Sequence, residues 1–201
     1  MLDKLKKILG AKPRENYVEK SVEDLYRGIS EETDLTPEEV AMIGGVESQH
    51  GKYTKNMGGG SATGTMQVMP RLAAAIRPGS EKTLGDRNTQ QSVASDFLNL
   101  NAPTIKELAQ GANKQVDIAD HYAMYNLGKG MGKKYLSAKD TDDISKILPA
   151  NVIKSNPKLY KYKTVGESKK ALKKFLEERG SEFEFSPSQQ DFQELFNKEE
   201  E

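Results

Sequence analysis

Hydrophobic positions along the chain recur mainly at the spacing of an amphipathic helix. The strongest start signal is Thr36-Pro37-Glu38-Glu39, in which the threonine can cap, the proline suits the first turn and Glu39 completes a capping box. Val40, Ile43 and Glu47 follow at i, i+3 and i+7, so they share one face. The pattern predicts a helix that ends at about Ser48 and carries a glutamate on its apolar stripe.

The same spacing predicts helices on both sides of this one. The other segments with a helical pattern are residues 2–9, 17–29, 88–100, 104–109, 115–125 and 167–178. No alternating strand pattern of useful length appears, and the glycines between Gly51 and Thr65 exclude regular structure beyond a short hairpin. The expected fold class is therefore mostly α, with at most a short β-hairpin.

Changes in composition divide the chain into three predicted parts. Residues 1–33 are an N-terminal helical extension, whose first helix is short, basic and amphipathic. A helix that packs on the body or a frayed chain end is favoured over one that lies on a membrane surface. Residues 34–180 form one domain of ordinary size. Residues 181–201 are acidic and poor in branched aliphatic side chains, which predicts a mobile tail.

The composition excludes several kinds of chemistry. The chain has no cysteine, so it has no disulfide, thiol nucleophile or thiolate metal site, and two histidines are too few for a histidine-built metal centre. We therefore expect neither a metal nor a cofactor. No apolar run approaches ~18 residues, so membrane insertion is not expected, and the first ten residues lack the apolar core of a secretory signal peptide.

The net charge of zero hides a segregation of charge along the chain. Residues 21–47 carry eight acids and one arginine, and residues 181–201 carry seven acids and one lysine. Residues 48–180 carry 22 Lys and Arg against 12 Asp and Glu. A basic middle favours a polyanionic partner, either nucleic acid or an anionic cell envelope, and equally fits a solvated surface.

Glu47 is the candidate for chemistry. A carboxyl group on the inner face of a helix is partly desolvated, and near the helix C-terminus the dipole also disfavours negative charge, so its pKa is expected to be raised. A carboxylic acid that keeps its proton at neutral pH is what cleavage of a glycosidic bond requires. The alternative, which position alone favours, is a helix-end glutamate turned to solvent.

Three sequence blocks resemble the lytic transglycosylase and goose-type lysozyme superfamily. They are Gly45-Val46-Glu47-Ser48-Gln49-His50-Gly51, Gly64-Thr65-Met66-Gln67-Val68-Met69-Pro70 and Ala123-Met124-Tyr125-Asn126-Leu127-Gly128-Lys129-Gly130. In that superfamily a Glu-Ser pair ends a helix, a Gly-Leu-Met-Gln-(Ile/Leu/Val)-Met-Pro block follows, and an Ala-Ala-Tyr-Asn-Ala-Gly-x-Gly motif comes later. The blocks stand in the same order here, and the resemblance covers about residues 34–165.

The resemblance implies a lysozyme-like helical domain with a substrate groove and Glu47 as catalytic acid. The residues it implies for substrate binding are Ser48, Ser61, Gly64, Met66, Gln67, Tyr125 and Asn126. Tyr125 matches the family tyrosine whose hydroxyl points toward the glutamate. Gly64 would let the backbone approach the sugar, and Met66 and Gln67 would lie along the groove.

Plainer roles stay open for several of these residues. Core packing is the alternative for Met66 and Tyr125, and shaping the turn that ends the helix is the alternative for Asn126. His50, three residues after the glutamate, is expected to be a surface or hydrogen-bonding group rather than a catalytic one.

The chain departs from the family pattern in several places, one of which is Thr65, where the family has a leucine before the methionine. A serine common in the family loop aligns with Gly58, which leaves Ser61 or Thr63 as substitutes. The family's later Ile-Pro-Tyr…Glu-Thr-Arg block has no clear counterpart; the nearest stretches are residues 147–151 and 156–160, without its glutamate or arginine.

The absence of acidic residues from the loop after Glu47 distinguishes two possible reactions, ring closure and hydrolysis. Goose-type enzymes have aspartates in the loop after their glutamate, which activate the attacking water molecule. In this chain residues 48–80 contain no Asp or Glu. We therefore favour a lytic transglycosylase, in which the muramyl 6-hydroxyl closes a 1,6-anhydro ring, over hydrolysis assisted by Asp86 or Asp96. A non-catalytic wall-binding virion protein is the remaining alternative.

The expected partner is the glycan strand of peptidoglycan, with no nucleic acid and no stable membrane insertion. Without an export signal, the chain is interpreted as a phage endolysin or virion component that is made in the host cytoplasm and acts on the wall. A virion protein could then bind the N-terminal helix or the acidic tail.

Overall fold

The computed structural model describes residues 20–55 and 61–186. Within these ranges the regular secondary structure is helical apart from isolated bridges, which pair Thr63 with Lys55 and Val68 and Asp143 with Thr164. The elements are α2 (Val22–Glu31), α3 (Pro37–Ser48), α4 (Pro70–Ile76), the 3-10 turn η1 (Ser80–Lys82), α5 (Arg87–Gly111), α6 (Ile118–Ser137), α7 (Ile144–Ile147), α8 (Ala150–Ser155), α9 (Pro157–Tyr160) and α10 (Val165–Gly180). The mostly α class is confirmed.

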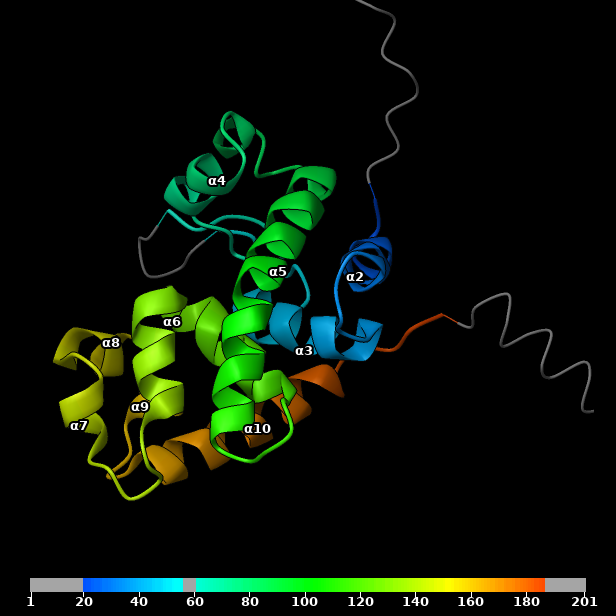
Figure 1. Cartoon of the computed structure of the whole chain (residues 1–201). Helices are drawn as coiled ribbons and strands as arrows, with labels where there is room; N and C mark the ends of the chain where they lie inside the picture. Colours follow the sequence, from blue (N-terminus) through cyan, green and yellow to red (C-terminus); the bar gives the residue numbers. More distant parts are fainter. Residues whose placement is uncertain (1–19, 56–60, 187–201) are drawn as a thin grey trace, which may run out of the picture.

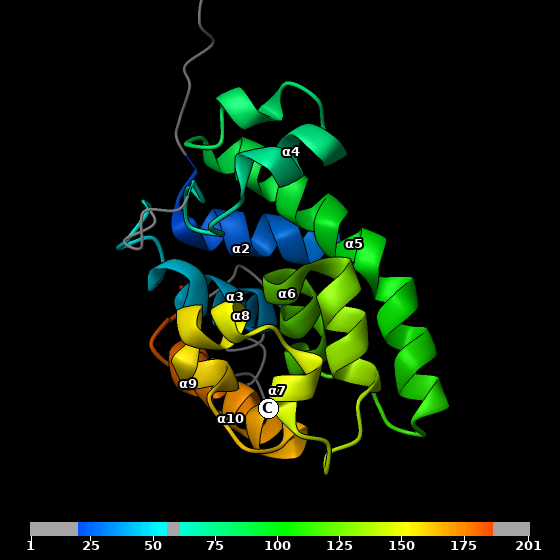
Figure 2. The ribbon, with the colours of Figure 1, turned by 90° about the vertical axis from the view of Figure 1, so that its left-hand side faces the viewer.

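Helix α3 lies at the centre of the fold (Figure 1). It packs against α2 on one side and α10 on the other, while α5 packs against α2 and α6. The short helices α7, α8 and α9 form a separate layer beside α6 and α10 (Figure 2). Val40 and Ile43 of α3 are fully buried in the shared core, so the central helix is held from several directions.

Local sequence signals explain where the main helices begin. The predicted capping box of α3 is present, because Thr36 accepts from the Glu39 amide and Glu39 accepts from the Thr36 amide. The same arrangement begins α2 at Ser21, α6 at Asp117 and α10 at Thr164. Each box satisfies backbone donors that a helix start otherwise leaves without a partner.

Two predicted helix ends are wrong. Helix α5 continues through Pro103, although residues 88–100 and 104–109 were expected to be separate helices. Buried side chains lie on both sides of the proline, and their packing outweighs the ~3 kcal/mol that an interior proline costs. Helix α6 kinks at Gly128, whose φ of 71° only glycine adopts readily, and resumes to Ser137 instead of ending near Tyr125.

The packed body extends beyond residues 34–180 at both ends. Leu25, Tyr26 and Ile29 of α2 are fully buried, so α2 belongs to the core and not to a separate extension. On the C-terminal side, Phe183 lies with its ring centroid 5.1 Å from Tyr26, and Phe185 packs on Phe183 at 4.9 Å. The predicted helix over residues 2–9 and most of the predicted acidic tail lie outside the described residues.

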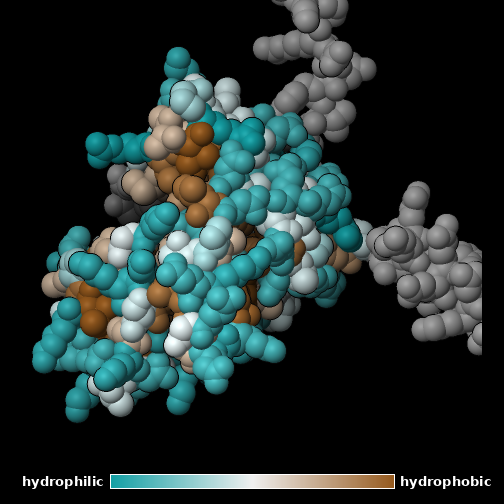
Figure 3. Space-filling model, viewed as in Figure 1, coloured by the Kyte–Doolittle hydropathy of each residue, from teal (hydrophilic) through white to brown (hydrophobic). Residues whose placement is uncertain are grey.

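The surface is largely hydrophilic, with apolar side chains exposed beside α4 and near α8 (Figure 3). No helix within residues 20–55 and 61–186 combines the length and hydropathy that a membrane span requires.

The aromatic contacts of the C-terminal segment generate a prediction. Truncation after Gly180 removes Phe183 and Phe185 and should lower the free energy of unfolding by about 2 to 4 kcal/mol, since large aromatic truncations from packed sites cost this much. Urea denaturation measures the change. Truncation after Ser186 is the matched control and should unfold like the full chain; equal stabilities for the two truncations would contradict the packing role.

Candidate active site

A cavity of about 540 Å³ opens beside the C-terminal end of α3. Its walls come from α3, the loop before α4, α6, α8–α9 and α10. The lining residues are Val46, Glu47, Ser48, Gln49, Tyr53, Lys55, Ala62, Gln67, Tyr122, Asn126, Ser155, Asn156, Pro157, Lys158, Leu159 and Phe175. The three sequence blocks therefore converge on one hollow, and a later segment of the chain closes it.

Glu47 is the carboxyl group of this cavity. It is the last residue but one of α3, and the residue is partly exposed to the cavity while its carboxyl group lies in desolvated surroundings. Burial raises the pKa of Glu47 from 4.5 to about 7, against the opposing effect of hydrogen bonds from Tyr122 and Asn126. About half of the molecules therefore carry the proton at neutral pH.

A chain of hydrogen bonds leads to the glutamate from α9. The Tyr160 hydroxyl donates to Asn126 Oδ1 at 3.0 Å, and Asn126 Nδ2 donates to the Tyr122 hydroxyl oxygen at 3.4 Å. The Tyr122 hydroxyl in turn donates to Glu47 Oε1 at 2.9 Å. Since Oε1 accepts this hydrogen bond, Oε2 is the oxygen that can carry the acid proton without breaking it.

Tyr122, and not Tyr125, donates the tyrosine hydrogen bond to Glu47 that the family resemblance implied. The Tyr125 hydroxyl donates to the backbone carbonyl of Met66 at 2.7 Å, and its ring packs against Phe97 with centroids 5.6 Å apart. Residues 122 and 126 are one helical turn apart and face the cavity together, whereas residue 125 is rotated toward the loop. The expected Tyr125–Glu47 contact is thus wrong, and the i,i+4 spacing of Tyr122 and Asn126 was the missed signal.

Two residues of the glycine-rich block, Gly64 and Met66, contribute to packing and do not contact the groove. Met66 is fully buried in the core, so it does not lie along the groove as expected. Gly64 has φ of 84°, and a Cβ there would lie 2.2 Å from the Gln90 side chain. The glycine therefore makes room for Gln90, whose Oε1 accepts from the Met66 amide, and not for a sugar.

Gln67 lies on the cavity wall, where it was expected. Its Nε2 donates to the carbonyl of Gly64 at 2.8 Å and to that of Tyr53 at 3.3 Å. Its backbone has the unusual φ of 46°. These bonds fix the amide plane and, among the described residues, leave Oε1 without a donor, so this oxygen can accept from a ligand.

The serines near the site differ in exposure. Ser48 is buried and its hydroxyl bonds to the carbonyl of Thr65 at 2.7 Å while accepting from the Gly51 amide at 2.7 Å. Its side chain therefore ties α3 to the loop, and the expected substrate contact through this hydroxyl is not supported. Ser61 is exposed and does not line the cavity, and the Thr63 hydroxyl bonds to the Ser61 carbonyl.

His50 has the hydrogen-bonding role that was expected. Its Nδ1 lies 3.1 Å from the Tyr26 hydroxyl, and its Nε2 lies 2.9 Å from the carbonyl of Arg179. A neutral ring satisfies both contacts, with Nε2–H donating and Nδ1 accepting. The histidine thus joins the end of α3 to α2 and α10.

The wall opposite Glu47 was not predicted from the sequence. It is formed by residues 155–159 and by Phe175 of α10, and Tyr160 supplies the outer end of the hydrogen-bond chain. Of the two stretches nearest to the missing family block, residues 156–160 contribute to this wall, whereas residues 147–151 do not line the cavity.

Glu47 is the one carboxylate among the residues that line the cavity. Asp96 forms an ion pair with Arg77, and Asp86 caps α5. Neither lines the cavity, and no group of three or more His, Asp or Glu side chains within the described residues could hold a metal ion. The arrangement supplies one acid with a raised pKa and several hydrogen-bonding groups.

Comparison with known proteins identifies one family. The family model described as Transglycosylase SLT domain matches residues 24–148. The matched segment contains Glu47, Gln67, Tyr122 and Asn126, and it ends before the wall formed by residues 155–159. A search of the curated proteins found no match.

The raised pKa of Glu47 has a consequence for stability. The folded state binds this proton more tightly than the unfolded chain, so the contribution of Glu47 to stability is fully present below pH 4.5 and is lost as pH rises through about 7. Glu47→Gln cannot ionise and should lack this fall, which is worth up to about 3 kcal/mol at 1.4 kcal/mol per pKa unit.

Chemical denaturation at pH 4 and pH 8 measures this difference. The Gln variant should gain stability relative to wild type on going to pH 8. Glu107→Gln, which removes an exposed glutamate of α5, should follow the wild type at both pH values. A constant difference between Glu47→Gln and wild type across this range would show that Glu47 ionises normally.

Proposed function

The chain belongs to the transglycosylase SLT domain family, and we propose that it cleaves the β-1,4 bond between N-acetylmuramic acid and N-acetylglucosamine with Glu47 as the acid. Membership in the family supports action on peptidoglycan through a lysozyme-like helical domain. The single carboxyl group in the cavity, with its pKa raised to about 7, is the observation that carries the proposed mechanism.

The first step is proton transfer to the leaving oxygen. Glu47 Oε2 gives its proton to the glycosidic oxygen as the bond to the muramyl anomeric carbon breaks, which leaves a carboxylate and a cationic sugar. The Tyr122 hydroxyl, already 2.9 Å from Oε1, strengthens its hydrogen bond as the carboxylate forms. The N-acetyl group of the sugar supports the cation, and we assign to Gln67 Oε1 the role of accepting its amide hydrogen.

The second step returns the enzyme to its starting state. The Glu47 carboxylate takes the proton of the muramyl 6-hydroxyl, whose oxygen bonds to the anomeric carbon and closes a 1,6-anhydro ring. A hydrolase instead uses a second carboxylate to activate water. None of the other lining residues is an acid, which favours ring closure, since one group of intermediate pKa serves both steps.

Analysis of the products tests this reaction. Digestion of purified sacculi in heavy-oxygen water should release muropeptides that end in 1,6-anhydro-N-acetylmuramic acid, lighter by one water than a lysozyme product and free of the label. Mass spectrometry distinguishes them from labelled reducing ends, which would show hydrolysis and make Asp86 and Asp96 the next candidates. A folded Glu47→Gln variant that keeps even a tenth of the turnover would contradict the role of the glutamate.

The biological setting stays a prediction. We propose wall lysis or local wall penetration, as an endolysin or virion component, as the use of this activity. The segments expected to bind a virion partner, residues 2–9 and the acidic tail, lie mainly outside the described residues.

A further inference from the structure

A second cavity, of about 340 Å³, adjoins the first. It is lined by Ser145, Leu148, Ala150, Ile153, Lys154, Pro157 and Lys161. Pro157 lines both cavities, so the two hollows are neighbours at the start of α9. Except for Ser145 and Leu148, these residues follow the segment that the family model matches. Most of the wall of the second cavity therefore lies outside the matched family segment.

The second cavity combines an apolar floor with positive charge at its edge. Leu148 is buried, and Ala150, Ile153 and Pro157 add aliphatic surface. Lys154 and Lys161 are exposed at this cavity, and Lys158 is exposed at the first one. A sugar needs mainly hydroxyl partners, whereas aliphatic surface next to ammonium groups suits a short peptide that has small apolar side chains and free carboxylates.

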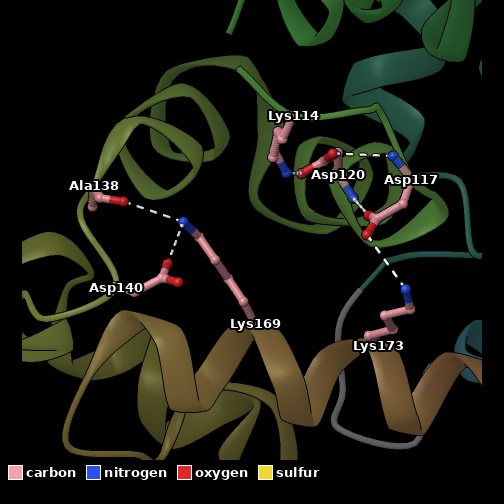
Figure 4. A network of polar contacts seen from close by, with 7 residues as sticks. All are labelled: Lys114, Asp117, Asp120, Ala138, Asp140, Lys169 and Lys173. Atoms are coloured by element: carbon pink, nitrogen blue, oxygen red, sulfur yellow. Dashed lines mark hydrogen bonds and ion pairs between the residues drawn. The ribbon is translucent and has the colours of Figure 1, made fainter. Parts of the chain in front are cut away.

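These three lysines lack carboxylate partners within the part of the chain that the structure describes. Lys158 instead places its ammonium group 5.8 Å from the ring centre of Phe175. The contrast with α10 is clear in Figure 4, where Lys169 pairs with Asp140 and Lys173 pairs with Asp117. Lys169 and Lys173 are thus neutralised by acids, whereas the charges of Lys154, Lys158 and Lys161 are available beside the cavities.

The substrate of the proposed reaction has the matching chemistry. Each muramic acid unit of peptidoglycan carries a short stem peptide that contains alanine methyl groups and free carboxylates. A glycan strand held with its scissile bond at Glu47 brings a stem peptide to the rim of the first cavity. The second cavity, with its apolar floor and its lysines, adjoins that rim at Pro157.

We propose that the cavity beside α8 and α9 is a subsite for this acidic stem peptide, with Lys154, Lys158 and Lys161 pairing with its carboxylates. The inference rests on the proposed function for the identity of the strand. It goes further in specifying that the chain recognises peptide-bearing strands over bare glycan. An anionic wall polymer would need the charge but not the apolar floor, so it is the less suitable ligand.

Ligand binding tests the subsite without requiring turnover. A disaccharide–tetrapeptide muropeptide and the same disaccharide without the peptide are titrated into isotope-labelled protein and followed by NMR. The muropeptide should bind more tightly and shift the amide signals of Ile153, Lys154 and Lys161, whereas the bare disaccharide should shift signals only around the first cavity. Equal affinity, or no shift at α8 and α9, would overturn the proposal.

Charge-neutralising variants sharpen the test. Lys154→Gln/Lys161→Gln should weaken muropeptide binding by roughly three- to twentyfold, the range for two solvated ion pairs. Lys133→Gln/Lys134→Gln removes the same charge from exposed positions of α6 that line neither cavity, and should bind like the wild type. Similar weakening in both double variants would show a general charge effect and contradict a defined subsite.

Two further outcomes separate this inference from its competitors. Poly(glycerol phosphate) that binds at the same lysines more tightly than the muropeptide would overturn the proposal in favour of an anionic polymer. Shifts at Lys154 and Lys161 with the muropeptide, combined with no cleavage of sacculi, would support the subsite and count against the proposed reaction. The two ideas can therefore fail independently.

Discussion

The structure depends on keeping one carboxyl group out of water without leaving it unpartnered. Burial favours the neutral form of Glu47, and full hydration would keep it ionised at neutral pH. The hydrogen bonds from Tyr122 and Asn126 oppose burial and hold the pKa at about 7, where the group can both give and take a proton. The proposed two-step chemistry needs that balance, because no other lining residue of the cavity is an acid.

The position of the glutamate is fixed from three sides. Ser48 ties the end of α3 to the loop at Thr65, and His50 connects it to α2 and α10. Two glycines allow this close packing, since a Cβ on Gly44 would lie 2.1 Å from the Tyr26 hydroxyl and one on Gly45 would lie 2.9 Å from the Arg179 carbonyl. The core therefore determines where the acid lies, and the aromatic contacts of Phe183 contribute from beyond the last helix.

The central helix could be predicted from the sequence because it depends on local signals. A capping box, a 3.6-residue stripe and a glutamate within that stripe are all contained in residues 36–48. The assignment of Glu47 as the acid came from the resemblance of three sequence blocks, since position alone favoured a glutamate turned to solvent. The hydrogen-bond partner of Glu47 depends on how α6 is rotated against α3, which no local pattern encodes, so Tyr125 was preferred to Tyr122. The wall made by α8 and α9 was missed for a related reason: helices of four to six residues are too short to show periodicity.

The protonation of Glu47 is the central claim, and the ionisation of its side chain can be observed directly. The protein is labelled with ¹³C at glutamate side chains, the Glu47 signal is assigned by its absence in Glu47→Gln, and its chemical shift is followed against pH. We predict a midpoint near 7 in the wild type and a higher midpoint in Tyr122→Phe, which removes a hydrogen bond that favours the carboxylate. A wild-type midpoint near 4.5, the ordinary value for a glutamate, would contradict the account.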